Sequence, residues 1–105
     1  MEEVQEILEK GNYSKKTQEY IIMFINAFVN TYGDYIKKEE LAKRIVRNLD
    51  SDIEFSDNFD QKTAGTYNPI SKKIEISSSV QEKENVMIHE LIHCITRYKP
   101  QNRYC

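Results

Sequence analysis

Two histidines one helical turn apart are the residues of this chain whose type and spacing best suit chemistry. His89 and His93 are its only histidines, and Glu90 directly follows the first, so the segment reads His-Glu-x-x-His. On an α-helix, residues i and i+4 project from one face, so both imidazoles can offer a ring nitrogen to one Zn²⁺ at about 2.0–2.1 Å. Glu90 can then act as general base on a zinc-bound water. The motif predicts a zinc site whose activated water can attack a substrate carbonyl group.

The third zinc ligand is not evident from the sequence. A catalytic zinc normally has three protein ligands and a water, but no Asp, Glu or His follows His93. One interpretation is that the chain is truncated and that the ligand lies beyond Cys105. A second is that an upstream carboxylate folds back, with Asp57, Asp60 and Glu75 as candidates. A third is that Cys105 itself binds the metal, which would suit a closed structural site better than an open catalytic one.

The histidines require a helix to position them. Ser79 and Glu82 match a capping box, which predicts an active-site helix over residues 80–98. Pro100 prevents the helix from extending much further. Cys94 lies about 100° around this helix from His93, so we expect its thiol to pack in the core rather than bind metal.

Residues 50–79 have the composition of a loop followed by a hairpin. Turn-forming residues dominate the first part, and two short strands are predicted at 63–67 and 73–77. The second strand alternates charged and apolar residues, which is typical of a half-buried strand. Gly65 inside the first strand indicates a bulge or a close approach of another part of the backbone.

Residues 1–49 are predicted to be helical. A short charged helix spans 2–10, and a longer apolar helix begins after the N-cap Ser14 and ends at Gly33. A third helix over 37–49 has one apolar face. Together with the hairpin and the histidine helix, these elements predict an α+β fold.

Composition limits the range of functions. The chain has 105 residues and a net charge of −2, which predicts one domain over 1–105 and argues against nucleic-acid binding. The basic cluster of Lys43, Arg44 and Arg47 is interpreted as a solvated helix face. The most apolar run, 20–29, is too short to cross a membrane. Two cysteines and an acidic N-terminus favour a cytoplasmic protein without a disulfide framework.

The segment 63–97 resembles the core of the zincin metallopeptidases. The order of a Gly-x-Tyr strand, a second strand and an HExxH helix is similar to that of small bacterial and phage zinc peptidases, including the ImmA/IrrE type. This resemblance implies that His89 and His93 bind zinc and that Glu90 is the general base. It also implies an edge strand that pairs with an extended peptide substrate, formed by Ile74, Glu75 and Ile76.

Several functional expectations follow from the motif and the resemblance. We expect a zinc-dependent endopeptidase that acts on a peptide or protein substrate. The alternative is a catalytically inactive zincin-like domain or fragment, with a structural zinc or a peptide-binding role. Tyr67 and Tyr98 are candidates to stabilise an oxyanion, although packing is the simpler interpretation. A truncated chain would also expose apolar surface and could self-associate.

Overall fold

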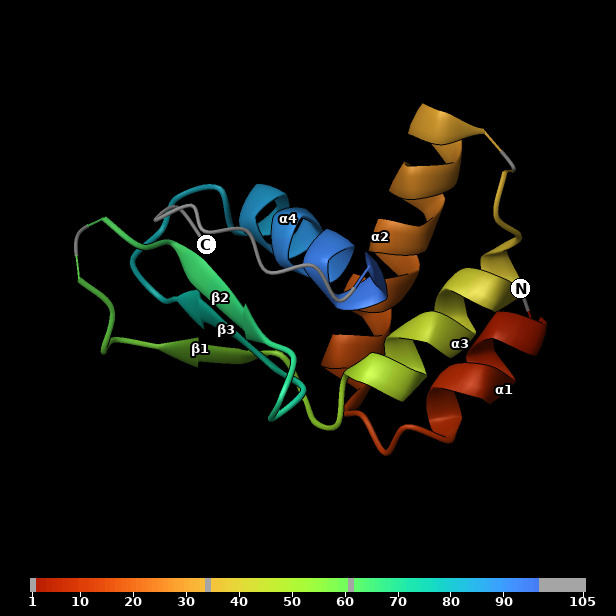
Figure 1. The fold of residues 1–105 in the computed structure, drawn as a ribbon, viewed down its shortest axis with the longest axis horizontal. Helices are drawn as coiled ribbons and strands as arrows, with labels where there is room; N and C mark the ends of the chain where they lie inside the picture. Colours follow the sequence, from red (N-terminus) through yellow and green to blue (C-terminus); the bar gives the residue numbers. More distant parts are fainter. Residues whose placement is uncertain (1, 34, 61, 97–105) are drawn as a thin grey trace.

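Four helices and three strands make up the described part of the chain. The structure is a computed structural model that describes residues 2–33, 35–60 and 62–96. In chain order the elements are α1 (Glu2–Glu9), α2 (Lys15–Tyr32), α3 (Lys38–Asn48), β1 (Glu54–Ser56), β2 (Gly65–Asn68), β3 (Lys73–Ser77) and α4 (Lys83–Thr96). Helices α1, α2 and α3 gather at one end of the molecule, and the sheet lies at the other (Figure 1). The predicted α+β class is confirmed. None of the described helices has the length and apolar character needed to cross a membrane.

The three N-terminal helices form close to their predicted positions. α1 ends at Glu9, and Asn12 adopts a left-handed φ of 58° in the turn that follows. The Ser14 side chain accepts a hydrogen bond from the main-chain N–H of Thr17 at 3.2 Å and caps α2. Gly33 ends α2 with a φ of 75°, which glycine adopts without strain. The apolar faces of these helices form a buried cluster that includes Val4, Leu8, Ile21, Phe24, Ile25, Leu41 and Ile45.

The sheet has the strand order β1-β3-β2, so β3 is its central strand. β2 pairs with β3 as the predicted antiparallel hairpin, and β1 pairs with the other side of β3 in parallel. The prediction that Ile74, Glu75 and Ile76 form an edge strand is therefore wrong, because β3 has a neighbour on each side. β1 spans only three residues, too few to reveal a period of two in the sequence.

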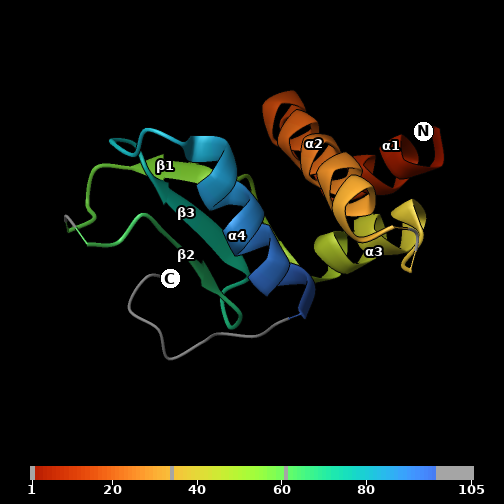
Figure 2. The same cartoon turned by 90° about the horizontal axis from the view of Figure 1, so that it is seen from above.

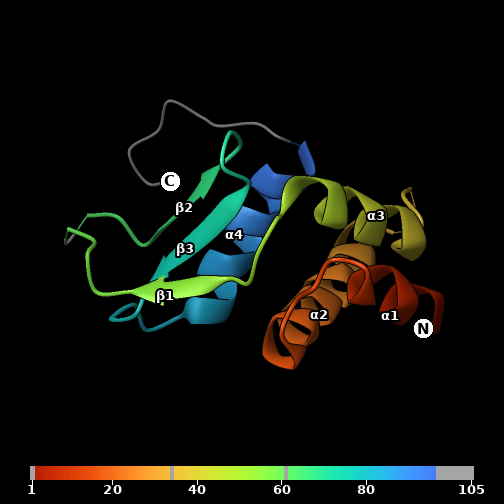
Figure 3. The ribbon, with the colours of Figure 1, turned by 90° about the horizontal axis from the view of Figure 1, so that it is seen from below.

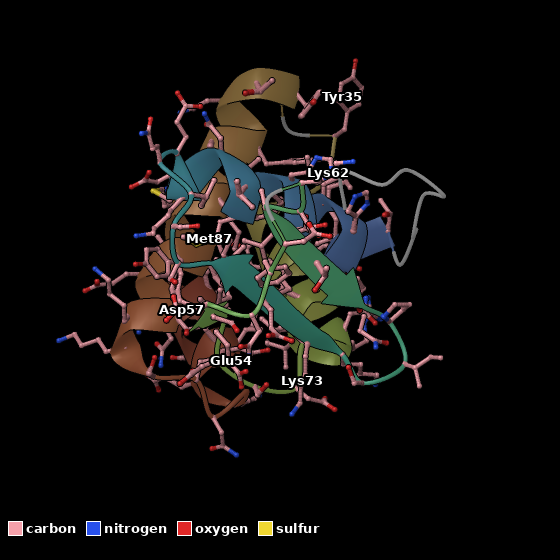
Figure 4. The ribbon with its side chains drawn as sticks, turned by 90° about the vertical axis from the view of Figure 1, so that its left-hand side faces the viewer. Tyr35, Glu54, Asp57, Lys62, Lys73 and Met87 are labelled. Atoms are coloured by element: carbon pink, nitrogen blue, oxygen red, sulfur yellow. The ribbon has the colours of Figure 1, made fainter. Side chains whose placement is uncertain are left out.

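The two faces of the sheet have different surroundings. Ile74 and Ile76 lie on the face that α4 covers, and both are fully buried. Side chains alternate along a strand, so Lys73 and Glu75 lie on the other face. Glu54 is paired in register with Glu75 and shares this face. Figure 4 shows Glu54 and Lys73 on the side of the sheet away from α4.

Helix α4 begins one turn later than predicted. Its first residue is Lys83, and the described part ends at Thr96. The predicted capping box does not form, because the Ser79 hydroxyl lies 3.0 Å from the hydroxyl of Ser77, at the end of β3. Residues 80–82 therefore connect β3 to the helix, and position 98, the predicted helix end, lies outside the described residues.

Helix α4 connects the two parts of the fold. It lies between the sheet on one side and helices α2 and α3 on the other, as Figures 2 and 3 show from opposite directions. Two tyrosine hydroxyls reinforce this junction at the end of α3. Tyr13 donates a hydrogen bond to the carbonyl of Leu49, and Tyr67 donates one to the carbonyl of Asn48 at 2.7 Å. The helical part, the sheet and α4 therefore hold one another in place around the histidine motif.

Candidate metal centre

His89 and His93 come together on one face of α4, as their spacing predicts. Their Nε2 atoms lie 3.0 Å apart, and their rings meet edge to face with centroids 4.6 Å apart. Two nitrogens bound to one tetrahedral zinc ion at about 2.0–2.1 Å are about 3.3 Å from each other. The observed geometry thus fits two ligands of a single ion after a small adjustment of the rings.

The Glu90 carboxyl group is buried beside the histidines. The residue is 1% exposed, and neither carboxyl oxygen has a hydrogen-bond partner among the described residues. Burial away from water raises the pKa of this group to about 7. Folded proteins satisfy nearly all of their buried polar groups, so an unpartnered carboxyl group marks Glu90 as a candidate functional residue. A pKa near neutrality also suits a group that accepts a proton and then returns it.

The residues next to the pair have structural roles. Cys94 is fully buried, and burial raises the pKa of its thiol to about 12, although a hydrogen bond with Tyr67 opposes this effect. The thiol therefore stays protonated at neutral pH, whereas metal binding requires the thiolate. Tyr67 is itself buried and donates to the Asn48 carbonyl. The packing interpretation of both residues is confirmed, and Tyr98 lies outside the described residues.

A pocket opens beside Glu90 between α4 and the start of β2. Its volume is about 230 Å³, and it is lined by Ala64, Asn85, Val86, His89 and Glu90. Sequence reasoning missed Ala64, Asn85 and Val86 as site residues. Helical spacing could have indicated two of them, because Asn85 and Val86 precede His89 by four and three residues and therefore lie on the same side of the helix.

Gly65 allows the helix to lie close to the strand at this pocket. A Cβ atom at this position would be 2.9 Å from Val86 Cγ1 and 3.1 Å from the main-chain oxygen of Glu75. The sequence predicted a bulge or a close approach of another part of the backbone; the nearest atom belongs instead to the Val86 side chain, which lines one wall of the pocket. Asn85 is oriented by its Nδ2 group, which donates to Glu82 Oε2 at 3.0 Å.

The structure brings none of the three proposed carboxylates to the histidine pair. In the described part of the chain, no three His, Cys, Asp or Glu side chains are close enough to hold one metal ion. Glu75 lies on the face of the sheet away from α4. Asp60 accepts two main-chain N–H groups of the following loop, each at 2.9 Å. Asp57, labelled in Figure 4, accepts a hydrogen bond from the Ser78 hydroxyl. Cys105 lies outside the described residues.

Comparisons with known proteins do not identify a relative. No protein-family model, no curated protein and no solved structure matches the chain. The functional argument therefore rests on the geometry of α4 and on the chemistry of its side chains.

Proposed function

We propose that the protein is a zinc-dependent endopeptidase with a zincin-like arrangement of its active-site helix. The observation that carries this proposal is the position of Glu90. Its carboxyl group is buried and unpartnered, and Glu90 lines the same pocket as His89, whose Nε2 atom is 3.0 Å from that of His93. A structural pair of histidines would not need a buried carboxyl group beside it, whereas a hydrolytic site needs a base.

His89 and His93 would hold the zinc ion through their Nε2 atoms. When bound, zinc lowers the pKa of a coordinated water to about 7 and polarises the substrate carbonyl group. Glu90 would take a proton from the attacking water and pass it to the departing amine. Because its pKa is raised to about 7, the carboxyl group can both accept and release a proton near neutral pH.

The substrate strand is reassigned from β3 to β2, because β2 is the outer strand next to α4. The Ala64 oxygen accepts from Ser77 N–H at 2.7 Å, which directs position 64 toward β3. In an antiparallel pair the main-chain groups of the next residue, Gly65, point the other way. An extended peptide could therefore pair with β2 at Gly65. The pocket of about 230 Å³ would take one small side chain, since pockets for larger ligands begin near 300 Å³.

The location proposed for this activity is the cytoplasm. Cys94 is a free thiol in the core, which fits a reducing compartment.

Zinc binding and peptide hydrolysis test the proposal together. We expect one zinc per chain, lost in His89→Ala, retained in Cys105→Ser and retained in Glu90→Gln. Hydrolysis of a quenched-fluorescent peptide library should need zinc and should fall at least about 100-fold in Glu90→Gln, as expected for loss of general-base catalysis.

Three results would contradict the proposal. Loss of zinc from both His89→Ala and Cys105→Ser would indicate a thiolate-closed structural site, and the alternative of an inactive zincin-like domain would then hold. Zinc bound equally well by His89→Ala would exclude the histidine pair as the metal site. Zinc-dependent hydrolysis unaffected by Glu90→Gln would remove the assigned base.

A further inference from the structure

A hollow with a basic rim lies between helices α1 and α3. Its volume is about 280 Å³, and its lining consists of Ile7, Lys10, Lys43, Val46 and Arg47. Ile7 and Val46 are partly buried and pack against the hydrophobic core, so they form an apolar floor. In Figure 3, α1 and α3 lie side by side at the end of the molecule away from the sheet.

A second hollow lies next to the first, toward the end of α4. Its volume is about 380 Å³, and Arg47 lines both hollows. The second hollow adds Arg44 to the rim and Ile95 to the apolar surface. We call the two hollows together the α1–α3 groove, with the lining residues Ile7, Lys10, Lys43, Arg44, Val46, Arg47, Asn48, Ile95 and Thr96.

The charge of the α1–α3 groove is opposite to that of the whole chain. The chain has a net charge of −2, yet among the described residues that line the groove four are cations and none is a carboxylate. Glu40 contacts Arg44 and Arg47, each at 3.5 Å, but all three side chains are substantially exposed. One carboxylate shared between two arginines leaves the groove positive, with Lys10 and Lys43 contributing further charge.

The shape and lining of the groove favour one kind of partner. Single-stranded nucleic acids are held largely by aromatic side chains that stack on the bases, and none of the described residues that line the two hollows is aromatic. A membrane surface is contacted by projecting apolar groups, whereas the apolar residues here form the floor of a concavity. Aliphatic side chains flanked by carboxylates would fill the floor and pair with the rim. We propose that the α1–α3 groove docks an acidic protein segment, with aliphatic residues as anchors and glutamates or aspartates facing Lys10, Lys43, Arg44 and Arg47.

This docking surface does not depend on the zinc site. The groove is built by α1, α3 and the end of α4, and none of its lining residues in the described part of the chain also lines the pocket beside Glu90. The sequence alone led us to interpret Lys43, Arg44 and Arg47 as a solvated helix face. In the structure Lys10 and the aliphatic floor lie beside them, so the proposal gives these exposed cations a partner. Sequence spacing within α3 alone does not reveal that arrangement.

The test uses a fluorescein-labelled peptide of about 12 residues, with leucines four residues apart and glutamates elsewhere, so that the leucines share one helical face. We expect saturable binding by fluorescence anisotropy that weakens as NaCl rises from about 50 to about 300 mM. Lys43→Glu/Arg47→Glu should weaken binding at least about tenfold, because it replaces attraction with repulsion. The matched control Lys15→Glu/Lys73→Glu makes the same change in net charge at exposed positions outside the groove and should retain binding.

Further measurements distinguish an acidic segment with aliphatic anchors from other kinds of partner. Replacing the leucines by serine should abolish binding, and a lysine peptide with the same leucines should bind the Lys43→Glu/Arg47→Glu protein better than it binds the original chain. Lys10→Glu/Lys43→Glu repeats the test without disturbing the contact of Arg47 with Glu40. Three results would each overturn the proposal. The control variant Lys15→Glu/Lys73→Glu could weaken binding as much as Lys43→Glu/Arg47→Glu does, or the serine peptide could bind as tightly as the leucine peptide. The third is an oligothymidylate of the same length that binds as tightly as the acidic peptide.

Discussion

Glu90 is 1% exposed, and its buried carboxyl oxygens have no hydrogen-bond partner among the described residues, so ionisation of this group should destabilise the metal-free protein. Burial raises its pKa from 4.5 to about 7. The folded state therefore holds this proton over a pH range in which the unfolded chain has released it. Stability is fully retained below pH 4.5, falls as pH rises, and levels off once pH exceeds the folded pKa of about 7.

The size of the effect follows from the same values. A pKa raised from 4.5 to about 7 corresponds to at most about 3 kcal/mol of unfolding free energy lost by about pH 8. Glu90→Gln keeps the shape of the side chain and removes the charge. We therefore expect this variant to gain about 2 kcal/mol or more over the original chain between about pH 5 and about pH 8.

Urea unfolding followed by circular dichroism, with a chelator present, measures this difference. The buried amide of Gln has a cost of its own, but that cost does not change with pH, so the pH-dependent part isolates the carboxyl group. Glu84→Gln, at an exposed position of the same helix, is the control and should follow the original chain. A constant difference between Glu90→Gln and the original chain across this range would refute the reasoning.

Three further predictions concern local contacts of the fold and are tested by the same unfolding assay. Tyr67→Phe should cost about 1–2 kcal/mol, because the buried carbonyl of Asn48 loses its donor; an unchanged urea midpoint would mean that water replaces the hydroxyl. Gly65→Ala should cost about 1–3 kcal/mol through its contact with Val86, and adding Val86→Ala should recover part of that loss rather than add to it. Ser14→Ala should cost about 1 kcal/mol because α2 loses its N-cap, whereas Ser14→Asp should stay close to the original stability.

The sequence was most informative where the determinants are local. Ser14 and Gly33 mark the ends of α2 because a side-chain cap and a positive φ depend only on neighbouring residues. The hairpin and the convergence of His89 and His93 follow from periods of two and of 3.6 residues in the same way.

Features that depend on distant parts of the chain were not predictable. β1 forms because it can pair with the free side of β3, about twenty residues later in the chain. A strand of three residues is too short to show a pattern that would indicate this pairing. Ser79 has the sequence of an N-cap, but its hydroxyl lies beside Ser77 instead. The burial of Glu90 and the pocket that it lines depend on where β2 lies against α4. Spacing within one helix cannot supply that information.

The two tyrosine hydroxyls that bond to the end of α3 influence how the protein unfolds. They bond to the consecutive carbonyls of Asn48 and Leu49, yet Tyr13 precedes α2 and Tyr67 belongs to β2. Each bond joins residues far apart in the sequence: Tyr13 and Leu49 are separated by 36 positions, and Asn48 and Tyr67 by 19. Releasing the end of α3 therefore breaks contacts to both halves of the molecule at once. We therefore expect amide protons in α2 and in β2 to exchange through a shared opening, as in a single cooperative unit.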